Sequence, residues 1–192
     1  MRRVCIGLSA VLFVLIVSVP AFAALEVIGT ATYQGADYNL IWDDDNNGNS
    51  VIWFDYTHAQ ERWSDQNVWA VGLDGQLTII WKPGINVTWT DATWRLPVTV
   101  GGEFVYGCDG MTNGGYNITS SEMGHLYYTE LGNPGFRDGA SCEYNPDYGL
   151  HNTGDFQNLV AAAWYWSSTE YAPPPVPRLV LQSQYRLPVL RQ

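Results

Sequence analysis

The polar run at residues 43–49, Asp-Asp-Asp-Asn-Asn-Gly-Asn, carries the side chains best suited to bind a metal ion. It matches the opening of an EF-hand-like calcium loop, in which oxygen ligands alternate along the chain and a glycine permits a sharp turn. The calcium ligands predicted on this basis are Asp43, Asp45, Asn47 and Asn49. Phe54 stands at the twelfth position, where an EF-hand has a bidentate glutamate, so a complete EF-hand is excluded. Because Asp, Asn and Gly also form ordinary polar turns, the run predicts either a calcium site of another kind or a turn between strands.

Motifs of enzyme catalysis are missing from the sequence. The histidines, His58, His125 and His151, lack the spacing of a metal-binding pair. Ser167 and Ser168 have no Gly-x-Ser-x-Gly elbow around them. Among the 19 acidic residues no pattern singles out a pair of glycosidase carboxylates. We therefore predict no enzyme and no catalytic residues.

The N-terminal residues 1–23 have the pattern of a secretory signal peptide. Arg2 and Arg3 form a charged start, residues 11–17 are apolar, and Ala21-Phe22-Ala23 is a small-x-small cleavage site. The apolar part is short for a membrane span. We expect the protein to be secreted or held in the cell envelope, with no membrane span after cleavage.

Export also decides how the cysteines are interpreted. Cys5 lies in the signal segment, which leaves Cys108 and Cys142 as an even pair. In an exported protein such a pair predicts a disulfide bond. A redox or metal-binding pair would have close spacing such as Cys-x-x-Cys, which this chain lacks.

The chain is strongly acidic. It has 9 basic and 19 acidic residues, and loss of Arg2 and Arg3 with the signal leaves 7 basic residues and a net charge of −12. Such a surface repels nucleic-acid backbones and anionic membranes, so neither is expected as a partner. The 9 Trp, 12 Tyr and 19 Gly are typical of a folded, loop-rich extracellular domain. Residues 24–172 are predicted to form that single domain.

Hydrophobic patterns and turn residues predict an α+β fold. Strands are expected at residues 27–33, 38–42, 51–54 and 77–81. A first helix is expected to start at a capping box, Thr57 to Gln60, and to end at Gly72. A second helix is expected to start at the capping box Thr119 to Glu122. Residues 136–158 have no sustained periodicity and are expected to form a binding loop.

Several segments carry a resemblance to a known family. They include Trp94-Arg95-Leu96-Pro97, the block Ser-Ser-Glu-Met-Gly-His-Leu-Tyr-Tyr at residues 120–128, and Trp-Tyr-Trp-Ser-Ser-Thr-Glu-Tyr at residues 164–171. With these residues the domain resembles the bacterial DUF1566 family, which includes the C-terminal domain of the Legionella collagen-like adhesin. The resemblance implies a C-type-lectin-like fold. Two helices then flank a small antiparallel sheet, with long loops between the second helix and the last strands.

The chain departs from this family at residues 173–192, which are rich in proline. Members continue there with aromatic strands, and a one-nucleotide shift of the reading frame would restore such residues. We interpret the tail as frameshifted, so that the last strands are missing and a sheet edge is left unpaired. A genuine Pro-rich tail is the alternative.

The resulting hypothesis is a secreted, non-enzymatic module for surface interaction or adhesion, with an extracellular glycan or protein as its partner. Exposed aromatic rings would form a platform for sugar rings, and the candidates are Trp69, Trp81, Trp89 and Tyr144. Two alternatives remain open. One is an exported hydrolase or modifying enzyme on the same fold, and the other is a structural envelope protein.

Overall fold

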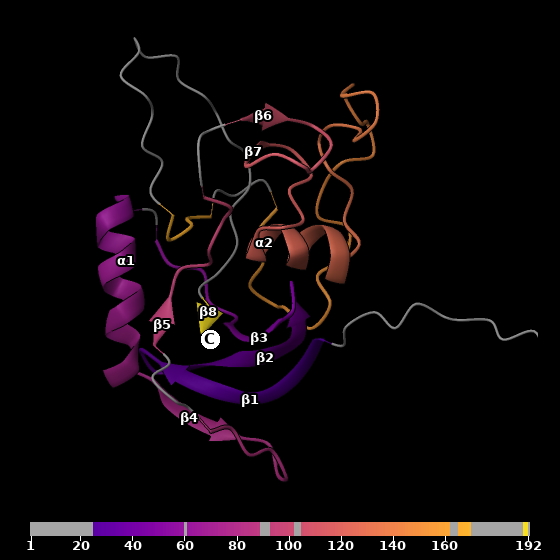
Figure 1. The fold of residues 1–192 in the computed structure, drawn as a ribbon. Coiled ribbons are helices and arrows are strands. Elements are labelled where there is room, and N and C mark those ends of the chain that lie inside the picture. The colour runs from indigo at the N-terminus through magenta and orange to yellow at the C-terminus, as the bar shows by residue number, and fades with distance from the viewer. Residues whose placement is uncertain are drawn as a thin grey trace, which may run out of the picture.

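The computed structural model describes residues 25–59, 61–88, 93–101, 105–161, 165–169 and 190–191. Its main element is a six-stranded sheet in the order β4-β1-β2-β3-β8-β5, in which all neighbouring strands are antiparallel (Figure 1). The strands are β1 (Leu25–Tyr33), β2 (Ala36–Asn46), β3 (Asn49–Phe54), β4 (Thr78–Trp81), β5 (Trp94–Arg95) and β8 (Leu190–Arg191). The sheet and two short helical regions confirm the predicted α+β class.

Two-residue turns connect the first three strands. Gln34-Gly35 and Asn47-Gly48 both have positive φ at each central residue, 50° and 83° in the first turn and 56° and 81° in the second. This backbone geometry matches the twist of the flanking strands and is the usual one for tight hairpins. The polar run 43–49 is therefore mostly strand, because β2 continues to Asn46 with an irregularity in its pairing after Asp43.

The first helix, α1 (Trp63–Gly72), starts later than the capping box at Thr57 predicts. The prediction is wrong because the Thr57 hydroxyl donates to the carbonyl oxygen of Asn158, 2.6 Å away, and so serves a long-range contact. Arg62 precedes the helix and provides no side-chain cap. The helix ends at Gly72 as predicted, and a short 3₁₀ turn, η1 (Leu73–Gly75), follows it.

The second helical region consists of α2 (Glu122–Gly124) and a π-helical turn, η2 (His125–Glu130). Its cap is Ser121, whose hydroxyl accepts from the Gly124 amide at 3.0 Å, so the predicted capping box at Thr119 is wrong. The Leu131 amide donates to the Leu126 carbonyl, five residues back, as in a π-helix. The Glu122 carboxylate is not part of a capping box, because it accepts hydrogen bonds from Arg95.

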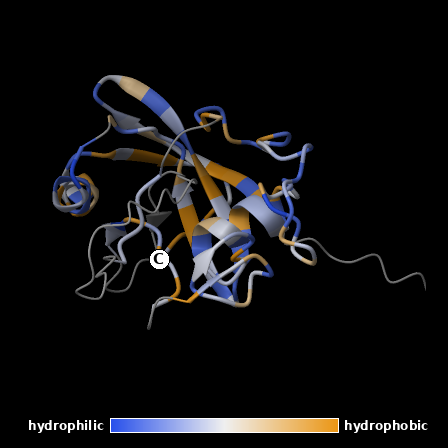
Figure 2. Cartoon of the chain, turned by 90° about the horizontal axis from the view of Figure 1, so that it is seen from above, coloured by the Kyte–Doolittle hydropathy of each residue, from blue (hydrophilic) through white to orange (hydrophobic). Residues whose placement is uncertain are grey.

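Both faces of the sheet are covered, one by α1 and the other by the second helical region (Figure 1). Ile52 and Phe54 of β3 pack in the core that includes Ala70 of α1, whereas Val51 and Trp53 pack in the core that includes residues of η2. A strand buried on both sides needs a continuous apolar run, which explains Val-Ile-Trp-Phe in β3. Figure 2 shows hydrophobic residues along these central strands. Burying each such side chain stabilises the fold by roughly 1.5–3 kcal/mol.

The tail contributes one short strand to the sheet. β8 lies between β3 and β5, where Leu190 pairs with Trp53 and Arg95 and Arg191 pairs with Ile52 and Trp94. The expectation that the sheet edge is left unpaired is therefore wrong at these positions, although β8 has only 2 residues. The signal peptide 1–23 and most of the tail predicted at 173–192 lie outside the described residues, and the frameshift remains a prediction.

Candidate functional site

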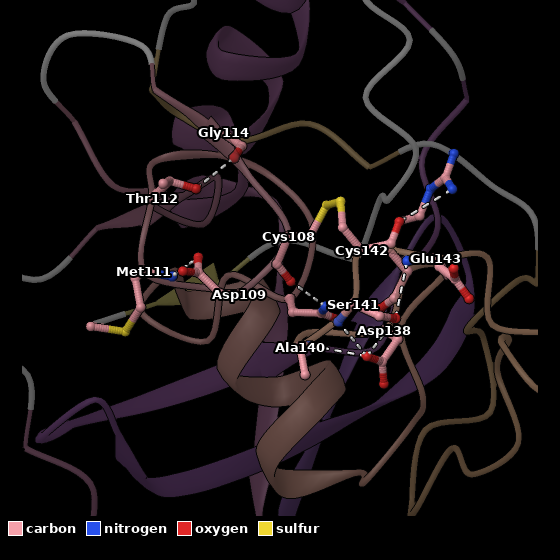
Figure 3. The surroundings of a disulfide bond; sticks show 12 residues. Cys108, Asp109, Met111, Thr112, Gly114, Asp138, Ala140, Ser141, Cys142 and Glu143 are labelled. Carbon is pink, nitrogen blue, oxygen red and sulfur yellow. Dashed lines mark hydrogen bonds between the residues drawn. A yellow bond between two sulfur atoms is a disulfide. The ribbon is translucent and has the colours of Figure 1, made fainter.

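Two loop segments, residues 105–117 and 134–148, are joined by the disulfide bond between Cys108 and Cys142 (Figure 3). Their Cα atoms lie 5.3 Å apart although the cysteines are 34 residues apart in sequence. The predicted disulfide is confirmed. Closing a loop of this length stabilises a folded chain by about 4 kcal/mol, chiefly by restricting the unfolded state.

Backbone pairing shapes the first segment, and one asparagine ties it to the second. The strands β6 (Tyr106–Gly107) and β7 (Gly114–Gly115) form a small parallel pair in the first segment. The Asn117 side-chain amide donates to the carbonyl oxygens of Cys108 and Arg137, at 2.6 and 2.9 Å. The Asn117 side chain therefore holds the two segments next to each other.

The second segment contains a tight turn organised by Asp138. Its carboxylate accepts hydrogen bonds from the Ala140 and Ser141 amides and from the Ser141 hydroxyl, as Figure 3 shows. These bonds, above all the one from the Ser141 amide, lower the pKa of Asp138 below its usual range. The turn brings Cys142 back towards Cys108 and keeps a negative charge at the surface.

Asp55 fixes the chain where it leaves the second segment and approaches residue 158. Its buried carboxylate accepts from the amides of Gln157 and Asn158, at 2.8 and 3.1 Å, and from the Asn158 side chain. Burial raises the pKa of Asp55, and these donors counter that effect. The carboxylate is thus used to anchor a loop.

Five aromatic rings gather on the two disulfide-linked segments, and we call them the aromatic loop surface. They are Tyr106, Tyr116, Phe136, Tyr144 and Tyr148. Their ring centroids lie 4.9 to 6.0 Å apart in successive contacts. Tyr106, Tyr144 and Tyr148 nevertheless remain 53%, 52% and 41% exposed. Clustered, exposed aromatic rings are typical of binding surfaces, because tyrosine combines an apolar face with a polar hydroxyl.

A cation already lies on this surface. The Arg137 guanidinium is 5.4 Å from the Phe136 ring centre and 6.0 Å from that of Tyr116. It also donates to the Cys142 carbonyl oxygen at 3.3 Å. The arginine therefore links the stacked pair Tyr116 and Phe136 to the disulfide.

Only one residue of the predicted aromatic platform belongs to this surface, and that residue is Tyr144. Trp69 instead donates to the Tyr33 hydroxyl at 3.0 Å and stacks on His58 against the core. Trp81 packs against the same core, and Trp89 lies outside the described residues. The prediction missed the other four rings, although their concentration around the two cysteines was visible in the sequence.

The four predicted calcium ligands lie in different surroundings. Asp43 is buried and accepts from Trp53 and Asn46, at 3.1 and 2.8 Å, whereas Asp45 is exposed and accepts from the Gly48 amide. Asn47 and Asn49 lie in and after the turn, and the Asn49 side chain donates to the Asn47 carbonyl. Within the described ranges, no group of three His, Cys, Asp or Glu residues is arranged to hold a metal ion. Calcium binding stays a prediction.

The hairpin tip is instead joined to the second helical region by a partly buried polar junction. His125 contacts Asn47 at 3.2 Å and Glu130 at 3.0 Å. Burial raises the pKa of Asp43, and burial with the nearby Asp43 charge raises the pKa of Glu130. We call Asp43, Asn46, Asn47, His125 and Glu130, together with the ion pair described next, the polar junction.

An ion pair completes the junction. The Arg95 guanidinium makes two hydrogen bonds to the Glu122 carboxylate, at 2.7 and 2.8 Å, and the Val98 amide donates to the same carboxylate at 2.6 Å. Glu122 is therefore a partner of β5, the strand that carries Arg95. The nearby Ser167 and Ser168 hydroxyls meet carbonyl oxygens of Thr169 and Pro97.

Comparisons with family models, curated proteins and solved structures found no match to this chain. The resemblance to the DUF1566 family therefore remains a proposal. Across the part of the chain that the structure covers, no helix is both long enough and apolar enough to cross a membrane.

Proposed function

We propose that this chain is a secreted, non-enzymatic interaction or adhesion module with a C-type-lectin-like fold of the DUF1566 type. Its partner is an extracellular protein or glycan, and the contact is made by the aromatic loop surface. The observation that carries this proposal is the exposure of Tyr106, Tyr144 and Tyr148 on two segments tied together by a disulfide.

The construction of the loops supports this role. Binding by a flexible loop loses free energy because the loop must become ordered, and a loop held in advance avoids much of this loss. Here the Cys108–Cys142 bond, the Asn117 amide and the Asp138 turn already hold the segments. Tyrosine adds a large contact area with few rotatable bonds.

The layout of the fold also supports it. A central antiparallel sheet has a helical region on each face, and a long irregular segment follows the second region. The resemblance implies this arrangement, with recognition by the loops. The acidity of the chain disfavours nucleic acid and sulfated polymers as partners.

The test uses the chain from residue 24 onward, secreted with its disulfide formed. Binding is measured on an array of neutral and sulfated glycans and on immobilised extracellular proteins. A double variant, Tyr144→Ala with Tyr148→Ala, should lose at least about tenfold in affinity, as expected when two anchoring aromatic residues are removed. The matched control is Val68→Ala, because Val68 is an exposed apolar residue on α1.

Two results would count against the proposal. The first is a partner that the double variant binds as tightly as the parent chain does. The second is turnover of a substrate by the purified chain, which would favour the exported hydrolase or modifying enzyme.

A further inference from the structure

We propose that the aromatic loop surface takes a basic polypeptide segment, with arginine or lysine side chains placed between its exposed tyrosines and the surrounding carboxylates. This inference rests on the proposed function and names the partner class of the same surface. It depends on two observations, an internal cation that already contacts the rings and an excess of negative charge around them.

The internal cation is Arg137. Its guanidinium lies over Phe136 and Tyr116, at 5.4 and 6.0 Å from the ring centres. Ring faces carry negative potential, so a cation above them is attracted, and arginine is the cation most often found there. The arrangement shows that these rings accommodate a guanidinium group. Arg137 covers only part of the cluster, since Tyr144 and Tyr148 remain about half exposed.

The charge around the rings is unbalanced. The two disulfide-linked segments contain one basic residue, Arg137, and four exposed acidic residues, which are Asp109, Asp138, Glu143 and Asp147. The lowered pKa of Asp138 keeps its carboxylate ionised in mildly acidic surroundings. The Asp109 carboxylate accepts from the Met111 amide at 3.1 Å and is likewise held in place. Rings and carboxylates thus share one surface.

Partners of different charge use this surface differently. An anionic ligand is repelled by it, and a neutral sugar gains ring stacking but no attraction from the carboxylates. A chain with arginine or lysine gains both, and complementary charge also speeds the encounter of the two molecules. Charge complementarity therefore favours a basic polypeptide segment over the other ligand classes.

The test measures binding of a fluorescent peptide that alternates arginine and glycine to the disulfide-bonded chain. A second peptide carries citrulline at every arginine position, so that only the charge differs. We expect the arginine peptide to bind at least about tenfold more tightly, with an affinity that falls as salt is added. Equal binding of the two peptides would overturn the inference.

Two double variants localise the effect. Glu143→Gln with Asp147→Asn should weaken arginine-peptide binding several-fold, and Tyr144→Ala with Tyr148→Ala should weaken it at least as much. The control, Glu61→Gln with Asp65→Asn, also removes two negative charges, one just before α1 and one in its first turn. It should have little effect on binding of the arginine peptide. An equal loss in the control would show nonspecific attraction to the acidic chain and would overturn the inference.

The outcomes separate this inference from the proposed function. If a neutral glycan binds through Tyr144 and Tyr148 while neither peptide does, the interaction module stands and the basic partner is wrong. If Tyr144→Ala with Tyr148→Ala changes the binding of neither glycans, proteins nor peptides, the proposed function and the basic partner are both wrong.

Discussion

The polar junction and the aromatic loop surface use side chains in opposite ways. In the junction, carboxylates and a histidine, which are residues suited to catalysis and metal binding, are buried or partly buried and fasten a hairpin to a helix. On the loop surface, tyrosines of the kind that usually fill cores are left exposed on a covalent frame. Residue type alone therefore indicates function poorly, and what each side chain contacts decides its role.

The largest effect is expected from removing the disulfide. Cys108→Ser with Cys142→Ser should lower the free energy of unfolding by about 4 kcal/mol, because the unfolded chain gains the freedom of a 34-residue loop. Denaturant unfolding followed by tryptophan fluorescence measures this change. Loss of partner binding with little loss of stability would instead mean that the bond mainly shapes the loops.

The polar junction should respond next most strongly. Glu122→Ala leaves the Arg95 guanidinium without the carboxylate that it contacts at 2.7 and 2.8 Å. We expect a loss of about 3 kcal/mol in the free energy of unfolding, since a largely buried charge then lacks its partner. Glu122→Gln keeps the shape and an acceptor oxygen, and it should cost less. Equal effects of the two variants would argue against a charge-dependent role.

High pH tests the core beneath the second helical region through Tyr127. Burial raises the pKa of this phenol from 10.0 to about 12. Because the folded pKa is the higher one, the stability from this group is full below pH 10 and declines as the pH rises through about 12. At pH 12 this group should have lowered the free energy of unfolding by about 2 kcal/mol. Tyr127→Phe should lack this part of the alkaline decline, measured by denaturant unfolding at each pH. An unchanged decline would contradict the prediction.

Low pH tests the loop surface, with the smallest expected effect. The pKa of Asp138 is lowered from 3.8, so its contribution is present above that pH and is lost as the pH falls through the folded value. Asp138→Asn should melt slightly below the parent chain near neutral pH, and the difference should shrink in acid. Melting temperatures across this range measure it. A constant difference would mean that shape, not charge, matters at this turn.

The parts of the fold that can be predicted from the sequence are those that depend on local patterns. The apolar run in β3, the strand at residues 27–33 and the paired cysteines each carry their own signal, and the structure confirms all three. The class of fold follows from such elements. The irregular stretch at residues 136–158 is also expected from the sequence, and within this described range the structure has one isolated strand-like pair.

The errors arise where distant partners compete with local signals. Thr57 has the sequence of a helix cap, but its hydroxyl meets Asn158 across the fold. Glu122 was expected to cap its own helix, but it binds Arg95 from another strand. Trp69 was expected on an exposed platform, but its indole donates to the Tyr33 hydroxyl and its ring packs against the core, which a local pattern does not reveal.

The covalent link between Cys108 and Cys142 has a consequence for how the protein withstands proteases. A single cut in the backbone between these residues would open the chain without releasing a fragment, since the two pieces stay tethered through sulfur. Such nicked molecules would run as one band on a gel without reductant and as two bands with it.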